Sequence, residues 1–297
     1  MKFNRLLLAL IAVLAASVIV SAQEVNVTQL KQTMENSLGN LTTYTYMRSA
    51  ETDILYTNNT IHKEINLVKS TNGEVDLVNQ SGLWNSNLTD RSNGNVLTWD
   101  GYFVNGSEYW KEGQNWTRFF VRNRAEVLED YNEIPGQVNL IRYSNMKIVG
   151  SENFQGVDVY KLVGSPILPI YRGMIGLQLL TAYIGSPFPL PQRLLRRSLD
   201  ISRTSLLNNS SIVVTAWVSK NDSMLRRLDI NSSLNITPRI LNITSPNYTI
   251  KSTISESTVY NNFGSPLKIE LPAGVPNESF RLRTVDWRWA LFGSVRP

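Results

Sequence analysis

The sequence contains no cysteine and a single histidine, His62. The absence of cysteine excludes disulfide bonds, thiolate metal sites, a cysteine nucleophile and a lipid-modified cysteine anchor. His62 stands beside Lys63 and Glu64 with no further ligand at metal-binding spacing, so we expect it on the surface of a strand. No G-x-S-x-G elbow and no phosphate-binding glycine-rich loop is present, and the carboxylates Glu126 and Asp130 are typical of a solvated helix face. We therefore expect no catalytic residue, no metal and no cofactor.

Runs of like charge are also absent. The chain has 29 Lys and Arg against 24 Asp and Glu. Lys2 and Arg5 are the only charges in residues 1–22, so the remainder has 27 bases against 24 acids, a net charge of +3. This weak excess, without a basic block, predicts no nucleic-acid partner.

The first 22 residues are typical of a signal peptide. Lys2 and Arg5 precede an apolar run at 6–20, and Val20-Ser21-Ala22 supplies small residues before a cut at Gln23. The alternative is an uncleaved anchor, because the segment 6–22 is just long enough. In both cases the remaining chain lies outside the cytoplasm, either secreted or on the extracytoplasmic face of the cell envelope. Its length suits one large domain or two small ones.

N-x-[ST] sequons occur 15 times, whereas the content of Asn, Ser and Thr predicts about five by chance. This excess indicates a secreted surface that carries many N-linked glycans; turn chemistry of an Asn-rich β protein explains part of it. None lies between Asn115 and Asn208. The sites that we expect to be glycosylated are Asn40, Asn58, Asn79, Asn87, Asn105, Asn115, Asn221, Asn231, Asn235, Asn242, Asn247 and Asn277.

Strand-like segments rich in Tyr, Thr, Val and Ile make up most of the chain. They lie at 42–56, 61–69, 73–84, 96–105, 108–111, 115–121, 146–150, 157–163, 211–219, 224–230, 248–260 and 267–271. Turn residues at 57–59, 70–73 and 100–101 separate some of them. We expect a helix at 28–38 capped by Thr28, and weaker helices at 124–131 and 138–143 on either side of Pro135-Gly136. The pattern predicts a meander of antiparallel strands.

The segment 162–192 differs from the rest because Arg172 is its only charge. Residues 170–184 read as a helix that is apolar on every side, and such a helix must be enclosed by protein, lipid or ligand. It is too short to span a bilayer comfortably. Three prolines then precede an amphipathic segment at 192–201. The helix either covers the core or contacts a ligand or membrane, and the sequence leaves both readings open.

The C-terminal tail, residues 281–297, mixes aromatic side chains with arginines. This mixture suits a membrane interface or a partner surface. We favour a tail docked on the sheet, because terminal segments with several aromatics usually bury them.

The order of several segments resembles a known superfamily. These segments are TYTY at 43–46, YFVNGSEYW at 102–110, GQNW at 113–116, VGSENFQGVDVY at 149–160, AWVSK at 216–220, LRR at 225–227 and YNNFGSPLKIELP at 260–272. Together they are similar to the LolA/LppX-like superfamily of envelope lipoprotein carriers, including its secreted archaeal members. The resemblance covers most of 25–272 through loose, spaced motifs. It implies a strongly curved antiparallel half-barrel, closed on its concave side by helices, with an apolar cavity for acyl or isoprenoid chains. The long apolar insert and the lack of a lipidated cysteine depart from the pattern.

We thus predict an α+β fold: a curved antiparallel β half-barrel at 23–280, with helices on the concave face and an apolar helical insert at 162–201. The expected function is a non-enzymatic, extracytoplasmic binder or carrier of a hydrophobic ligand, a lipid. The expected ligand contacts are Ile170, Met174, Leu177, Leu180, Tyr183 and Ile184. Expected contacts with an anionic headgroup or membrane surface are Arg172, Arg193, Arg196 and Arg197. The alternative is a surface structural or adaptor domain that docks another envelope protein.

Overall fold

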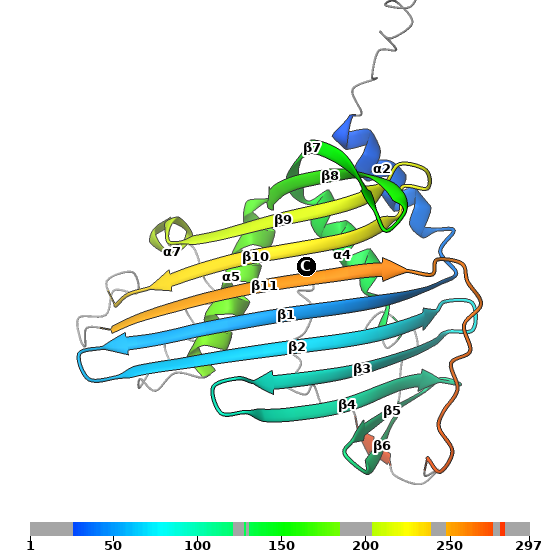
Figure 1. Ribbon diagram of the computed structural model, residues 1–297, viewed down its shortest axis with the longest axis horizontal. Coiled ribbons are helices and arrows are strands. Elements are labelled where there is room, and N and C mark those ends of the chain that lie inside the picture. Colours follow the sequence, from blue (N-terminus) through cyan, green and yellow to red (C-terminus); the bar gives the residue numbers. More distant parts are fainter. Residues whose placement is uncertain are drawn as a thin grey trace, which may run out of the picture.

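The fold is built on one large, open β-sheet, seen in a computed structural model that describes residues 26–120, 128, 131–184, 204–238, 248–275 and 280–282. The twelve strands lie in the order β12-β6-β5-β4-β3-β2-β1-β11-β10-β9-β8-β7 (Figure 1). The strands are β1 (Thr43–Asn58), β2 (His62–Asp76), β3 (Ser81–Asp90), β4 (Asn95–Val104), β5 (Ser107–Glu112), β6 (Asn115–Phe120), β7 (Ser144–Phe154), β8 (Val157–Pro166), β9 (Ser210–Ser219), β10 (Leu225–Ile236), β11 (Tyr248–Asn261) and β12 (Phe280–Leu282). Neighbouring strands are antiparallel except β12, which runs parallel to β6.

The longer helices gather on one face of this sheet. The helices are α2 (Val27–Leu38), α4 (Glu133–Arg142), α5 (Leu168–Ile184) and α7 (Thr204–Asn208). In Figure 1, α4 and α5 lie behind the strands, and α5 crosses them from β9 to β2. An open, curved antiparallel sheet with helices on one face confirms the predicted α+β class.

Buried and more exposed side chains alternate along β1, and this alternation defines the two faces of the sheet. Its even-numbered residues, such as Tyr44, Tyr46 and Ile54, are buried under the helices, and we call this side the inner face. The odd-numbered residues form the outer face, where the Met47 side chain is 61% exposed. Large apolar and aromatic side chains at every second position explain why this segment forms a strand with one covered face. β1 lies near the middle of the sheet, between β2 and β11.

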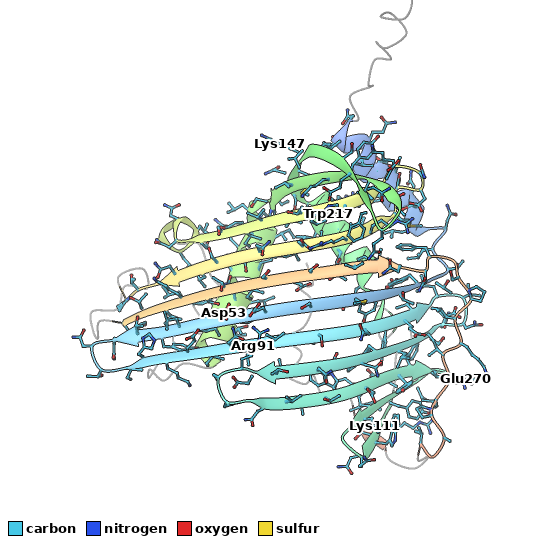
Figure 2. The ribbon with its side chains drawn as sticks, in the orientation of Figure 1. Asp53, Arg91, Lys111, Lys147, Trp217 and Glu270 are labelled. Carbon is cyan, nitrogen blue, oxygen red and sulfur yellow. The ribbon has the colours of Figure 1, made fainter. Side chains whose placement is uncertain are left out.

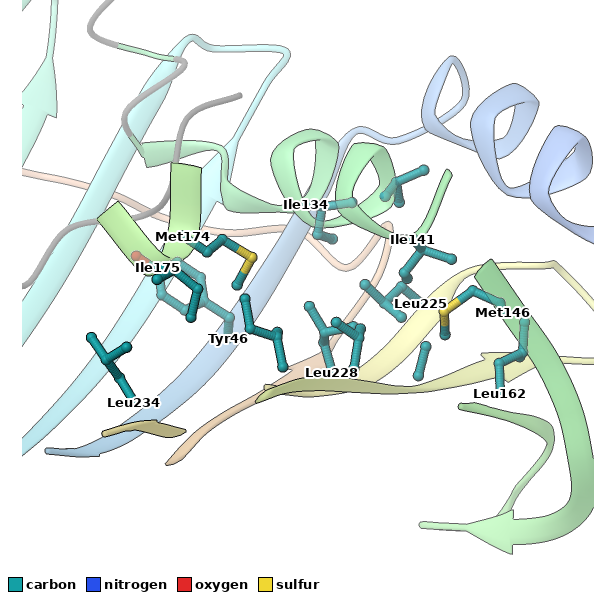
Figure 3. Close-up of a cluster of buried hydrophobic side chains, with 14 of the residues drawn as sticks. Tyr46, Ile134, Ile141, Met146, Leu162, Met174, Ile175, Leu225, Leu228 and Leu234 are labelled. Atoms are coloured by element: carbon teal, nitrogen blue, oxygen red, sulfur yellow. The ribbon is translucent and has the colours of Figure 1, made fainter. Parts of the chain in front are cut away.

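The hydrophobic core fills the space between the inner face and the helices. Figure 3 shows Met174 and Ile175 of α5 and Ile134 of α4 facing the sheet side chains Tyr46 and Leu228. Burying side chains of this size stabilises the fold by about 1.5–3 kcal/mol each. This core holds α4 and α5 against the sheet.

The expected turn at 70–73 is wrong, and so is the strand at 73–84. β2 runs unbroken to Asp76, and the turn comes later, where Asp76 accepts hydrogen bonds from the backbone and side-chain nitrogens of Asn79. Gln80 then adopts a positive φ of 49°. Gly73 lies opposite Tyr46 in the strand, and a Cβ there would be 2.1 Å from the Tyr46 ring. Glycine is thus present for close packing and not for a turn.

Two helix boundaries also differ from expectation. α2 begins at Val27, and Asn26 is its N-cap, with the Asn26 side chain accepting from Thr28 N at 2.8 Å. α4 includes Pro135 and Gly136, which we expected to lie outside it. Pro135 is tolerated because the amides of the first helical turn have no partner within the helix. Of the helix expected at 124–131, all but residues 128 and 131 lie outside the described residues.

The chain after β11 forms no strand at 267–271, contrary to expectation. The predicted alternation is present, because Leu267, Ile269 and Leu271 are half-buried while Lys268 and Glu270 are exposed. Lys268 pairs with Glu270 at 3.1 Å. Alternating apolar and polar side chains are typical of a half-buried strand, but a strand also needs a neighbouring strand to hydrogen-bond with, and residues 267–271 pair with none that the structure describes. Further along, β12 pairs with β6. Residues 283–297, which carry the aromatic side chains of the tail, lie outside the described residues, so the docked tail stays a prediction.

Candidate functional site

Helices α4 and α5 cover opposite ends of the inner face. At one end, the Tyr44 hydroxyl donates to Asn132 Oδ1, next to the start of α4, at 2.9 Å. At the other end, the Tyr56 hydroxyl donates to the carbonyl oxygen of Ala182 in α5 at 2.5 Å. These contacts fix both helices against the same strand, β1, twelve residues apart. The inner face between them is the candidate site.

A row of half-buried side chains crosses five strands in this interval, and we call it the Ala50 row. Its members are Ile230, Glu256, Ala50, Lys69 and Leu88, which lie opposite one another in register on β10, β11, β1, β2 and β3. All five are half-buried, although they lie in the interior of a large sheet. Ala50, at the centre of the row, has the shortest side chain. The inner face is therefore less completely covered here than at its two ends.

Apolar side chains continue beside the row toward α5. Thr52 is buried, and its neighbours in register, Ile254 on β11 and Leu67 on β2, are half-buried. One step further, Ile54 and Ser252 are buried again. The incompletely covered surface thus extends over two registers. Ile254 and Leu67 flank β1 in one register, and Glu256 and Lys69 flank it in the other.

Four charged side chains gather where the row faces α4, and we call them the Arg48 cluster. Two of them, Glu256 and Lys69, belong to the row itself. Arg48 Nη1 lies 3.1 Å from Glu133 Oε1 of α4, and Arg48 Nη2 lies 2.8 Å from Glu256 Oε2 of β11. The fourth member, Lys69, has its Nζ 5.7 Å from the centre of the Trp99 ring. The side chains of Arg48, Glu133 and Glu256 are 9%, 13% and 15% exposed. Two positive and two negative charges make the cluster neutral overall.

Burial perturbs the titratable groups around this cluster. Removal from water, together with the nearby Arg48, lowers the pKa of Lys69 to about 8, although Glu133 and Glu256 oppose the shift. Burial also raises the pKa of the Tyr46 and Tyr260 hydroxyls well above the usual value, with Glu133 adding to the rise. At neutral pH the site therefore holds protonated Lys69 and neutral tyrosines.

The predicted ligand contacts on α5 include both buried and half-buried side chains. The helix itself is confirmed at Leu168–Ile184. Met174 is buried in the core, whereas Ile170, Leu177 and Leu180 are half-buried. The side chains of Tyr183 and Ile184 lie outside the described residues.

Two polar side chains of α5 donate hydrogen bonds within the protein, although the buried Oε1 of Gln178 accepts none among the described residues. Gln178 Nε2 donates to the Ser252 carbonyl oxygen at 2.9 Å, and the Thr181 hydroxyl donates to the Leu177 carbonyl oxygen at 3.0 Å. These bonds explain how polar side chains are accommodated in a helix that packs on the core. Part of α5 therefore belongs to the core, as one of the two readings of the sequence expected.

The predicted arginine contacts are not assembled within the described residues. Arg172 is exposed on α5. Arg193, Arg196 and Arg197 lie outside the described residues, as does the expected amphipathic segment 192–201. The structure thus places a different arginine, Arg48, at the inner face.

Sequence reasoning missed the Arg48 cluster. Arg48 follows Tyr44 and Tyr46 in the alternation and thus stands at an inward position of a strand whose other inward side chains are mostly apolar or aromatic. That break in the pattern was visible. Its partner Glu133 is 85 residues away in the chain, and nothing local connects the two.

Two further expectations concern metals and membranes. His62 is exposed on β2, as predicted. In the described part of the chain, no three His, Cys, Asp or Glu side chains gather in a way that could hold a metal ion. Within the same ranges, no helix has both the length and the hydrophobicity needed to cross a bilayer.

The sequons that the structure describes lie at the surface. Asn58 is half-buried, and the exposed ones among the expected sites are Asn40, Asn79, Asn87, Asn105, Asn115, Asn221, Asn231 and Asn235. Asn87, Asn231 and Asn235 stand on the outer face, which is turned toward the viewer in Figure 2 with Asp53 and Trp217 labelled. Asn242, Asn247 and Asn277 lie outside the described residues.

Comparison with known proteins gives likenesses of fold. No protein-family model matches the chain, and no curated protein is a significant match. A solved structure of LprF from Mycobacterium bovis is similar at 16% identity and a TM-score of 0.41, covering 84% of this chain and 97% of that chain. The Mycobacterium tuberculosis lipoprotein LppX is similar at 12% identity and a TM-score of 0.38, covering 82% and 98%. A putative outer membrane lipoprotein-sorting protein domain from Vibrio parahaemolyticus is similar at 7% identity and a TM-score of 0.22, covering 82% and 95%. At these scores the chain is similar to these proteins but is not assigned to a family.

Proposed function

We propose that the protein binds or carries a hydrophobic ligand with a long apolar chain, a lipid, outside the cytoplasm. The observation that carries this proposal is the half-burial of the Ala50 row in the middle of the inner face. Here α4 and α5 cover the two ends, and the interval between them presents isoleucine and leucine side chains beside the charged Glu256 and Lys69.

The energetics favour an apolar chain at this place. Each buried methylene contributes about 0.8 kcal/mol, so about ten methylenes contribute roughly 8 kcal/mol before the cost of association is subtracted. Ile230, Ile254, Leu67 and Leu88 provide the apolar contacts on the sheet. The half-buried Leu177 and Leu180 of α5 are proposed contacts on the helical side.

The location and modification of the protein complete the proposal. Residues 1–22 act as the signal peptide, and N-linked glycans occupy sequons on the outer face and the turns. Asn87, Asn231 and Asn235 lie on the face opposite α4 and α5, so glycans there leave the ligand site clear. Arg193, Arg196 and Arg197 remain proposed contacts with an anionic membrane surface on the basis of the sequence alone.

A matched pair of variants tests this function. Ala50→Phe adds an aromatic ring at the centre of the Ala50 row, whereas Ser49→Phe adds the same ring at the adjacent, exposed position of the outer face. If the ring displaces about three methylenes of a bound chain, the loss is about 2.4 kcal/mol, roughly fifty-fold in affinity. Binding is measured as the fluorescence of an acyl chain with a terminal pyrene group, together with the melting temperature of each variant.

The expected result is a large loss of binding for Ala50→Phe and wild-type binding for Ser49→Phe, with both proteins folded. Wild-type binding by a folded Ala50→Phe protein would show that the ligand does not lie along the Ala50 row. A wild-type protein that takes up no acyl chain at all would favour the alternative, an adaptor domain with a filled core.

A further inference from the structure

The Arg48 cluster is arranged to hydrogen-bond with something beyond its own ion pairs. Glu133 uses Oε1 for Arg48, and Glu133 Oε2 is buried without a hydrogen-bond partner among the described residues. The same holds for Nε of Arg48. Both atoms belong to charged groups, and a charged group left without a hydrogen bond in a buried place costs more than a neutral one.

Two neutral side chains beside the cluster also carry a buried polar atom without a hydrogen-bond partner among the described residues. Tyr260 is fully buried on β11, and its hydroxyl has no partner within the described ranges. Gln137, one helical turn after Glu133 on α4, donates through Nε2 to the Thr258 hydroxyl at 3.2 Å, but its buried Oε1 accepts nothing there. Thr258 lies directly opposite Arg48 in the sheet, so α4, β1 and β11 bring these groups to one place.

The chemistry of these four atoms is specific. Glu133 Oε2 and Gln137 Oε1 are acceptors, Arg48 Nε is a donor, and the Tyr260 hydroxyl acts as either. A group that both donates and accepts satisfies them better than one that does only one of these. Because the two bases and two acids of the cluster cancel, an added full charge of either sign would have no net counter-charge.

Resting on the function proposed above, we infer that this place binds an uncharged hydroxyl group carried by the hydrophobic ligand. The apolar chain then extends along Ile254 and Leu67 toward α5, and the hydroxyl lies between Glu133, Gln137 and Tyr260. The site selects against a carboxylate on the same chain, because a carboxylate cannot donate to Glu133 Oε2 or Gln137 Oε1 and the neutral cluster offers it no net positive charge.

Three probes of equal chain length test the inference: 1-dodecanol, dodecanoate and dodecane, each displacing the pyrene-labelled acyl chain. Tyr260→Phe and Gln137→Met remove the unpartnered atoms with little change in size or charge. Tyr248→Phe is the matched control, because Tyr248 lies on the same strand and is also buried, but at the other end of β11. The melting temperature of each variant confirms that it is folded.

The expected result is a loss of at least five-fold in dodecanol affinity for Tyr260→Phe and Gln137→Met, with dodecane affinity unchanged. Tyr248→Phe keeps the wild-type affinity for both, and the wild type prefers dodecanol to dodecanoate. Equal losses for dodecanol and dodecane, or unchanged dodecanol affinity, overturn the hydroxyl site alone. A wild-type protein that binds neither the probes nor the pyrene chain overturns the proposed function and this site with it.

Discussion

Replacing Arg48 by methionine should lower the free energy of unfolding by about 3 kcal/mol, although methionine keeps the length of the apolar stem. The substitution leaves Glu133 and Glu256 on a largely buried face without their shared partner. Removing one member of a buried ion pair costs about 3–5 kcal/mol, and the 9–15% exposure of these side chains places the expected value at the lower end. The nearby Lys69 compensates only in part, because burial already disfavours its charged form.

Urea denaturation followed by tryptophan fluorescence measures this effect. With a slope of about 3 kcal/mol per molar urea, the midpoint should fall by about 1 M. Two controls isolate the cause. The triple variant Arg48→Met, Glu133→Gln, Glu256→Gln removes the charges of these three side chains, and its free energy of unfolding should return to within about 1 kcal/mol of the wild type. Arg91→Met breaks the exposed pair with Glu51, and it should cost less than about 1 kcal/mol.

An Arg48→Met variant that unfolds at the wild-type midpoint would show that the two carboxylates do not depend on Arg48. A triple variant as unstable as the single one would also contradict the prediction. In that case the loss would come from packing around position 48 and not from two unpaired carboxylates.

Three further predictions concern Lys69, two glycines and the glycans. The pKa of Lys69 is about 8 in the folded protein and 10.5 ordinarily, so between these pH values the unfolded chain binds more protons. The free energy of unfolding of the wild type relative to Lys69→Met should therefore rise by about 2 kcal/mol from pH 7.5 toward pH 10. A difference that stays constant with pH would contradict this. Gly73→Ala should lower the free energy of unfolding by about 2 kcal/mol or more in thermal unfolding, because its Cβ would meet the Tyr46 ring. Gly136 is exposed on α4 with open space around it, so Gly136→Ala should stabilise the protein by about 0.5–1 kcal/mol. Similar effects of the two substitutions would contradict the packing at Gly73. Glycopeptide mass spectrometry of the secreted protein should find glycans at Asn87, Asn231 and Asn235, and unmodified asparagine at all three would refute a glycosylated outer face.

The alternation of aromatic and polar residues made the central strands predictable. Tyr44, Tyr46 and Tyr56 recur at even positions, and the structure places all three on the inner face. The turn at 70–73 was mispredicted because Asn72-Gly73 has turn chemistry, whereas Gly73 is required by the ring of Tyr46 on the neighbouring strand. That requirement arises only when the two strands pair, and no local signal contains it.

The candidate site was predictable in part. The apolar helix 170–184 was expected at the ligand, and α5 does lie on the inner face, although Met174 belongs to the core. The Arg48 cluster was not expected, because it depends on the register of β1, β2 and β11 and on the placement of α4. Register determines that Ala50 lies between Glu256 and Lys69, and the sequence alone leaves it undetermined.

Organic extraction of the purified, secreted protein, followed by mass spectrometry of the extract, shows whether the protein carries a lipid. A binder of hydrophobic ligands should yield about one lipid molecule per protein, one that contains a long apolar chain. The same extraction should give that lipid from Ser49→Phe and little or none from Ala50→Phe. A folded wild-type protein that yields no lipid, and that takes up no pyrene-labelled chain afterwards, would contradict the account.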